Sequence, residues 1–133
     1  MRVLALFLAL LPGPALAEGT QPADPPMTAE AFERFVQGRT MDTHDQTGRY
    51  GVETFLPGRR AIWRDAEQCL EGTWRPQGEM ICFDYQGIAT PFCWTYHDRG
   101  GWLMAWLDGD RQDAPITLHP SDEVVTCEGY FGV

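Results

Sequence analysis

Three residue types that hydrolases use stand side by side near the C-terminus, in the run His119-Pro120-Ser121-Asp122. A catalytic triad needs its serine, histidine and carboxylate to meet in space, and folds assemble these residues from distant parts of the chain. Ser121 is the only serine, and it lacks the flanking glycines that expose the nucleophile of α/β-hydrolases. We therefore interpret the run as a turn and assign no catalytic residue.

Three aspartates, Asp108, Asp110 and Asp113, fall within one predicted turn. Carboxylates gathered in this way can hold calcium. The spacing differs from an EF-hand, because Asp113 stands where that loop needs glycine and His119 stands where it needs a bidentate glutamate. We interpret the cluster as a solvated hairpin tip, and assign neither a metal ligand nor a cofactor site.

Met41 and His44 carry a thioether and an imidazole, which copper and zinc sites use, within one predicted strand. Residues three apart in a strand point to opposite faces, so these two side chains cannot chelate one ion. Asp42 and His44 do share a face and would form an acid–base pair if Glu53 or His97 came near. The simpler interpretation is a surface ion pair.

One late strand is apolar on both of its faces. A strand of this kind is either buried on two sides or presents one apolar face to a partner. An arginine pair after the predicted turn at 56–58 could instead bind a carboxylate or phosphate, or pair with Asp65 or Glu67. The sequence therefore supplies five candidate binding residues: Trp102, Met104 and Trp106 on one strand face, and Arg59 and Arg60 at the turn.

The four cysteines are Cys69, Cys82, Cys93 and Cys127, spaced too widely for a CxxC redox or zinc motif. An even cysteine count in an exported chain predicts two disulfides, which also removes thiol chemistry.

The pairing of two strands favours one connectivity among the three that four cysteines allow. If Cys82 lies opposite Cys93, then Ile81 faces Trp94 and Phe83 faces Phe92, so one face is wholly apolar and both cysteines lie on the other. We predict a cross-strand Cys82–Cys93 bridge, with Cys69 joined to Cys127.

The first seventeen residues have the order of a secretory signal peptide: basic Arg2, an apolar run from Val3 to Leu11, and a small-residue cleavage site ending at Ala17. The apolar run is shorter than the roughly 20 residues that span a bilayer, and no later run approaches that length. We expect a periplasmic or secreted protein, cleaved after Ala17, without a membrane span.

The mature chain is acidic, with nine arginines, no lysine and nineteen carboxylates, a net charge of −10. Binding a polyanion needs clustered lysine or arginine, so nucleic acid is a poor partner. A basic periplasmic protein or a small ligand fits better.

The elements that must position these residues follow from patterning. Residues 18–26 are rich in proline and predict a flexible leader, and 27–133 a single disulfide-bearing domain. Thr28 is a candidate N-cap for one amphipathic helix over Ala29–Gln37, which Gly38 ends. Eight strands are then predicted, at 40–44, 50–55, 61–64, 70–75, 79–85, 92–97, 102–107 and 116–119, with a candidate ninth at 124–127. Glycine or proline turns separate most of them.

This pattern predicts a mainly β fold, a small antiparallel meander that curls or closes into a barrel, with the helix covering an open end or edge. The five tryptophans are numerous enough to line a ligand cavity or to fill the core.

The segments Tyr50-Gly51-Val52-Glu53, Gly72-Thr73-Trp74 and Cys93-Trp94, with the turn at 56–60 and Ile81-Cys82-Phe83, resemble a group of short exported bacterial proteins of unknown function. The resemblance implies a periplasmic location and a sheet-rich fold, and no site residues. In general build the chain also resembles the periplasmic lysozyme inhibitors, which implies only a similar architecture.

Two function classes follow. The first is a non-catalytic binding or accessory protein for a protein partner or a small ligand. The second, ranked below it, is a small periplasmic hydrolase that uses Asp, Glu and His.

Overall fold

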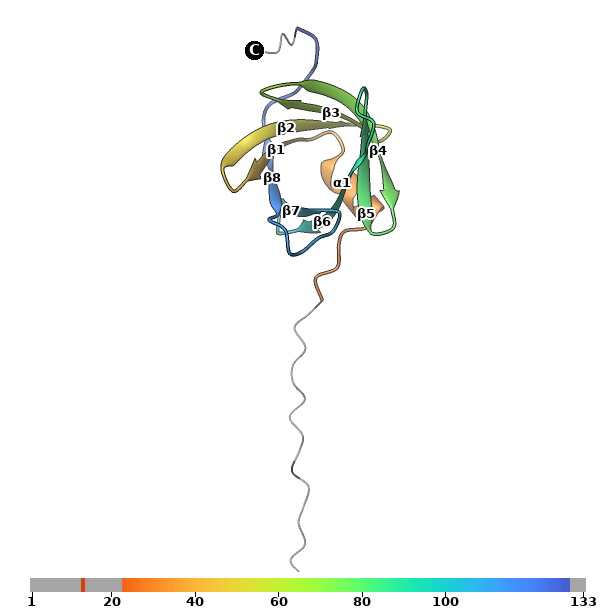
Figure 1. Ribbon diagram of the computed structural model, residues 1–133, viewed down its shortest axis with the longest axis vertical. Coiled ribbons are helices and arrows are strands. Elements are labelled where there is room, and N and C mark those ends of the chain that lie inside the picture. The colour runs from red at the N-terminus through yellow and green to blue at the C-terminus, as the bar shows by residue number, and fades with distance from the viewer. Residues whose placement is uncertain (1–12, 14–22, 130–133) are drawn as a thin grey trace, which may run out of the picture.

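Eight antiparallel strands form a closed barrel in the computed structural model, which describes residue 13 and residues 23–129 (Figure 1). Each strand pairs with the next along the chain, and the last pairs with the first. The predicted mainly β barrel is therefore confirmed. The strands are β1 (Thr40–Asp45), β2 (Gly48–Leu56), β3 (Arg60–Asp65), β4 (Cys69–Gln77), β5 (Met80–Tyr85), β6 (Phe92–Asp98), β7 (Leu103–Leu107) and β8 (Ile116–Ser121).

The helix α1 (Ala29–Val36) begins at the predicted residue and ends one residue earlier than predicted, with Gln37 as the C-cap. The Thr28 hydroxyl accepts a hydrogen bond from the Ala31 N–H at 3.2 Å, which satisfies one of the free donors of the first turn. Gly38 follows with φ +76°, the left-handed conformation that suits glycine after a helix.

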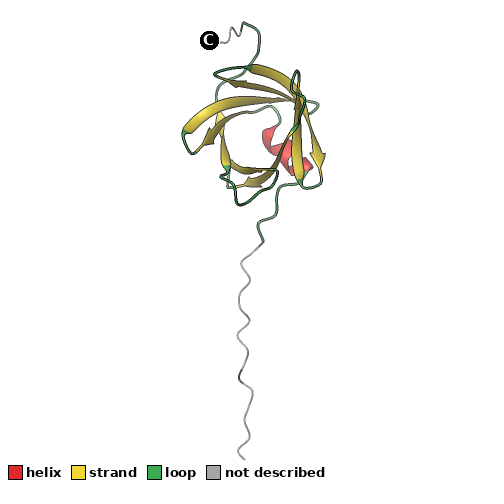
Figure 2. Cartoon of the chain, viewed as in Figure 1, coloured by secondary structure: helices red, strands yellow, loops and turns green. Residues whose placement is uncertain are grey.

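The helix closes one end of the barrel, and Figure 2 shows it within the outline of the ring of strands. Phe32 and Val36 are fully buried and belong to the core cluster. The Phe32 ring lies 4.4 Å from that of Tyr96 and 5.2 Å from that of Trp74, measured between centroids. These contacts make α1 a plug rather than a surface helix.

Both predicted disulfides are present, Cys69–Cys127 and Cys82–Cys93, and the described chain has no free cysteine. The predicted β5–β6 register is also confirmed, with Cys82 opposite Cys93, Ile81 opposite Trp94 and Phe83 opposite Phe92. Disulfides of this kind are typical of proteins that meet oxidising compartments. Within the residues described, no helix has the length and apolar character needed to cross a bilayer.

Residues 124–127 form no strand, so the prediction of a ninth strand there is wrong. The Val125 N–H donates to the Thr54 hydroxyl at 3.0 Å instead of entering a ladder. Val125 itself is buried against the outer wall. Residues 124–127 cannot join the sheet, because the closed barrel has no free edge with which they could pair. Residues after β8 therefore form a strap across the outside, and β8 itself runs to Ser121, two residues further than predicted.

The predicted signal peptide lies outside the described residues, apart from residue 13. Of the predicted leader, residues 23–26 are described, and they contact the barrel through Asp24. The Asp24 carboxylate forms ion pairs with Arg99 at 2.7 Å and with Arg111 at 2.6 Å. These bonds hold its pKa well below the usual range.

Candidate functional site

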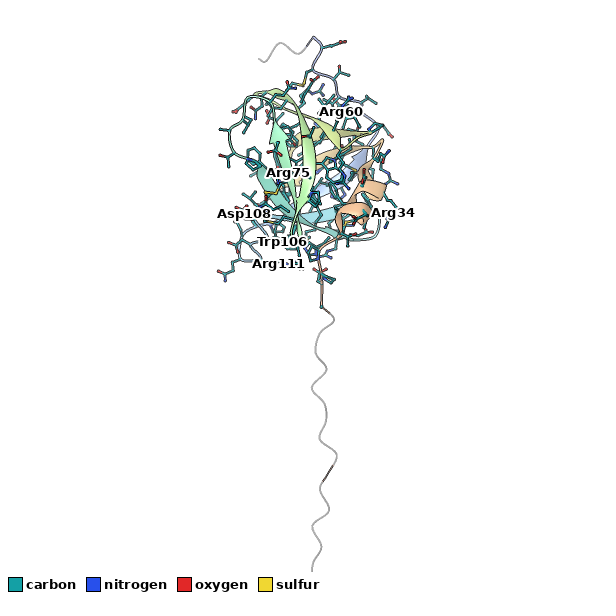
Figure 3. The ribbon with its side chains drawn as sticks, turned by 90° about the vertical axis from the view of Figure 1, so that its right-hand side faces the viewer. Arg34, Arg60, Arg75, Trp106, Asp108 and Arg111 are labelled. Carbon is teal, nitrogen blue, oxygen red and sulfur yellow. A yellow bond between two sulfur atoms is a disulfide. The ribbon has the colours of Figure 1, made fainter. Side chains whose placement is uncertain are left out.

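A cavity of about 200 Å³ occupies the half of the barrel that α1 leaves free. Figure 3 shows the two ends, with Arg34 of α1 at one and Asp108 of the β7–β8 loop at the other. Seven of the lining side chains are aromatic, Tyr50, Trp63, Phe83, Tyr85, Phe92, Trp94 and Tyr96, and the rest are Thr43, Glu53, Asp65, Gln68, Leu70, Ile116 and Leu118. Tyr50 and Phe92 are exposed at the mouth, while Phe83 and Tyr96 are buried deeper inside.

Two glycines make room for the aromatic wall. A Cβ on Gly51 would lie 2.0 Å from the Trp63 ring, and a Cβ on Gly72 would lie 2.7 Å from the Tyr85 ring. Both glycines lie within strands, where glycine commonly marks a close approach of another group. The missing side chains let the indole and the phenol lie directly against the backbone.

Glu53 is the buried carboxyl of this cavity, only 4% exposed. It lies on β2 directly opposite Trp63 on β3, so both side chains point inward. The Tyr85 hydroxyl donates a hydrogen bond to Glu53 Oε1. Burial raises the pKa of Glu53 to about 7, and the bond from Tyr85 opposes this shift only in part.

The other titratable groups of the cavity are three tyrosines and one aspartate. Burial raises the pKa of Tyr50 to about 12, and burial together with the charge of Glu53 raises those of Tyr85 and Tyr96 well above the usual value. Burial also opposes ionisation of Asp65, but hydrogen bonds from the Trp63 indole and the backbone N–H groups that follow outweigh it and lower its pKa. Near neutral pH the tyrosines are therefore uncharged, Asp65 is ionised and Glu53 is the group that titrates.

The arrangement can bind a molecule with an apolar body and one polar end. Aromatic rings supply the apolar walls, and Glu53 supplies one oriented polar group at depth. A carboxyl with a displaced pKa in an enclosed site is typical of functional positions. Among the described residues, no group of three or more His, Cys, Asp or Glu side chains is placed to hold a metal ion.

The predicted tryptophan patch lies on the outer wall, not in the cavity. On β7, Leu103 and Ala105 point into the core, so Met104 and Trp106 point outward. Trp106 is only 8% exposed, because the Arg111 guanidinium lies 3.9 Å over its ring. Trp102, just before β7, stacks on His119.

Arg59 and Arg60 lie far from this patch, and Figure 3 shows Arg60 and Trp106 on opposite sides of the barrel. Arg59 forms an ion pair with Glu33 of α1 at 3.0 Å and covers the Trp74 ring, rather than pairing with Asp65 or Glu67 as its sequence position suggests. The helix brings Glu33 close in space although it is 26 residues away. Arg60 is exposed. The five sequence candidates therefore do not form one surface.

The other sequence motifs also remain apart. In the His119–Asp122 run, the His119 Nε2 lies 3.2 Å from the Thr117 hydroxyl, and the Ser121 hydroxyl accepts a hydrogen bond from Glu123 N–H. Two aspartates of the β7–β8 loop accept hydrogen bonds from backbone N–H groups of the same loop, Asp110 from Gln112 and Asp113 from Ala114.

Met41 points into the core, whereas Asp42 and His44 face outward, as strand alternation predicts. Asp42 forms a surface ion pair, as predicted, but its partner is Arg49 at 2.7 Å and not His44. Glu53 lies inside the barrel and does not approach this pair.

Sequence reasoning missed the cavity residues Glu53, Trp63, Tyr85 and Tyr96 as a site. One signal was present: Gly51, Glu53 and Phe55 alternate on one face of a predicted strand, so a carboxyl shares the face of a core phenylalanine. The barrel closure that gathers the rings around Glu53 depends on pairings between distant strands.

No protein-family model, curated protein or solved structure matches the chain. The geometry of the cavity is therefore the basis for assigning a function.

Proposed function

We propose that the protein is a non-catalytic binding protein that holds a small, largely apolar molecule in its barrel, outside the cytoplasm. The observation that carries this proposal is the aromatic cavity of about 200 Å³, plugged by α1 at one end and accessible at the other. This volume is below the roughly 300–1,000 Å³ typical of pockets for drug-sized ligands, which suits a compact metabolite rather than a polymer.

The export part of the proposal is supported by the signal-peptide pattern and by the two disulfides. The proposed periplasmic location rests on the signal-peptide pattern of residues 1–17.

The alternative, a small hydrolase using Asp, Glu and His, has less support. General acid–base catalysis needs the acid and the base within hydrogen-bond reach of one substrate. His44 and His119 lie together on the outer wall, with ring centroids 5.4 Å apart, and His97 packs against Trp106. Glu53 inside the barrel has Tyr85 as its hydrogen-bond partner.

A fragment screen tests the binding function. Small aromatic and alicyclic compounds would be screened against the oxidised protein by saturation-transfer NMR, and hits titrated by the fluorescence of Trp63 and Trp94, which line the cavity. The variant Leu70→Trp fills the cavity from β4. Ile62→Trp, on the adjacent strand outside the cavity lining, is its matched control.

We expect hits that bind the wild type and Ile62→Trp equally and lose binding in Leu70→Trp. Hits that bind both variants alike would place the binding elsewhere, and a screen without hits would contradict the proposed function.

A further inference from the structure

The cavity combines buried negative charge with aromatic faces, and this combination points to a class of ligand. Its lining contains two carboxyl groups, Glu53 and Asp65, and no arginine or histidine. The whole chain has no lysine. A ligand entering this space therefore meets two carboxyl groups and no basic side chain of the lining.

From these groups we infer that the cavity binds a compact organic ammonium ion, whose positive nitrogen lies between the Glu53 carboxylate and the ring of Trp63. This inference rests on the proposed binding function and names the ligand class of the same site.

Glu53 is placed to accept the nitrogen. Within the described chain its one side-chain hydrogen bond engages Oε1, donated by Tyr85, so Oε2 is left to accept an N–H from a ligand. The Tyr85 bond also fixes the orientation of the carboxyl, which reduces the ordering cost when a ligand binds. A hydrogen bond between two charged partners is stronger than a neutral one.

The aromatic rings supply the second attraction. Glu53 and Trp63 are direct cross-strand neighbours, so a cation on the carboxylate lies beside the indole. Cations within about 6 Å of a ring centroid are attracted to its face, most strongly for tryptophan. Tyr50 lies 5.7 Å from Trp63 between ring centroids and extends the aromatic surface to the mouth.

The protonation of Glu53 makes binding of a cation depend on pH with a definite sign. The groups that face Glu53 are Tyr85 and Tyr96, which stay neutral, and Tyr50 and Asp65 nearer the mouth. A cation binds the ionised carboxyl, so its affinity rises as pH increases through about 7. A neutral ligand that accepts a hydrogen bond from protonated Glu53 shows the opposite trend.

Benzylamine and benzyl alcohol test the inference, because they share one ring and differ in charge. Isothermal titration calorimetry at pH 5, 6, 7 and 8 would compare both probes on the wild type, Glu53→Gln and the control Glu71→Gln, whose carboxyl is exposed on β4. We expect benzylamine to bind more tightly than benzyl alcohol at pH 8 and to weaken towards pH 5. In Glu53→Gln its affinity falls about 10- to 100-fold, the range for losing a charged hydrogen bond, while benzyl alcohol still binds.

Two results would overturn the inference in different ways. Benzyl alcohol binding as tightly as benzylamine, or more tightly as pH falls, would leave a small-molecule site and remove the ammonium preference. Binding of neither probe, together with a fragment screen without hits, would remove the proposed function as well.

Discussion

Glu53 is an ionisable side chain that the barrel keeps almost wholly from water. A carboxylate in such a place loses hydration that one tyrosine hydroxyl does not replace, so the neutral acid is favoured until about pH 7. A core position of this kind would usually be apolar, and a glutamine or leucine would fill it without a charge. The residue therefore costs stability at the pH where it is ionised.

This cost predicts how stability changes with pH. The pKa of Glu53 is about 7 in the folded protein against 4.5 for the free side chain. Between these values the unfolded chain releases the proton while the folded chain keeps it, so the free energy of unfolding falls as pH rises and levels off above about 7. At about 1.4 kcal/mol per pH unit, the loss is on the order of 3 kcal/mol.

Urea denaturation from pH 4 to pH 8 checks this sign. Glu53→Gln removes the group, so the unfolding free energy of the wild type minus that of this variant should fall as pH rises. The Glu71→Gln variant should follow the wild type. A constant difference across the range would contradict a buried, titrating Glu53.

For individual residues, the sequence predicts well those contacts that depend on a local pattern of side chains. The Cys82–Cys93 register follows from two short apolar runs, because placing Cys82 opposite Cys93 pairs all four large side chains directly on one face. The Arg59–Glu33 pair could not be predicted in this way. Its geometry depends on where α1 docks, and no local pattern contains that information.

Strands β2 and β3 show how an element can be shaped by a missing side chain. Gly51 leaves the inner surface of β2 bare, and the Trp63 ring of β3 leans across it. Glycine lowers the strand propensity of β2 at this position. Because it has no side chain, it also lets a large ring lie flat along the cavity wall.

Gly51→Ala should therefore be destabilising although alanine suits a strand better than glycine. The new Cβ would lie 2.0 Å from the indole, which must move, and overpacking of this kind costs about 1–3 kcal/mol. A double-mutant cycle with Trp63→Leu measures the coupling by chemical denaturation. The alanine should cost much less in the Trp63→Leu background, and strictly additive costs would show that the ring does not lie on Gly51.

The helix gives a second prediction for an element. Phe32→Ala removes the ring that meets Trp74, Phe55 and Tyr96 at the closed end, and should cost about 3–5 kcal/mol. Phe35→Ala on the same helix is the control, because Phe35 is only partly buried and lies under the Arg39 guanidinium. Equal losses in the two variants would show that α1 is not the plug.

The elements themselves were largely predictable, since a glycine or proline lies in or beside every connection between strands except the one between β3 and β4. The strand at 124–127 was overpredicted because Val124, Val125 and Thr126 have the β-branched character of a strand. Barrel closure leaves no free edge for them, and that is a property of the whole sheet.

At the scale of the whole molecule, two straps hold the barrel from outside. Before α1, Asp24 pairs with Arg99 and Arg111, and the Met27 N–H donates to the Tyr96 carbonyl at 2.7 Å. After β8, Glu123 forms ion pairs with Arg49 and Arg64, and the Cys69–Cys127 bond ties the chain to the start of β4. Both straps cross wall strands on the outside and leave the cavity mouth open.

The two disulfides should differ in their contribution to stability. Cys69 and Cys127 close a loop with a sequence separation of 58, against 11 for Cys82 and Cys93. The chain-entropy model gives about 4 kcal/mol for the longer loop and about 3 kcal/mol for the shorter one.

Paired Cys→Ser variants of each bridge, unfolded in urea, check the order. Loss of Cys69–Cys127 should also free the strap, so that the Val125 amide exchanges its hydrogen faster. Unchanged exchange would show that Val125 is held by the Thr54 contact alone.

The pairing of β1 with β8 also determines when the protein can finish folding. The last strand supplies the partner of the first, so the ring cannot close until the residues of β8, up to Ser121, are available. Contacts this distant in sequence form slowly, in milliseconds to seconds for β-rich domains. Barrel closure therefore waits for the C-terminal strand, whereas the pairings between consecutive strands do not. A circular permutant that joins β8 directly to β1 would make this pairing local, and would close its barrel sooner.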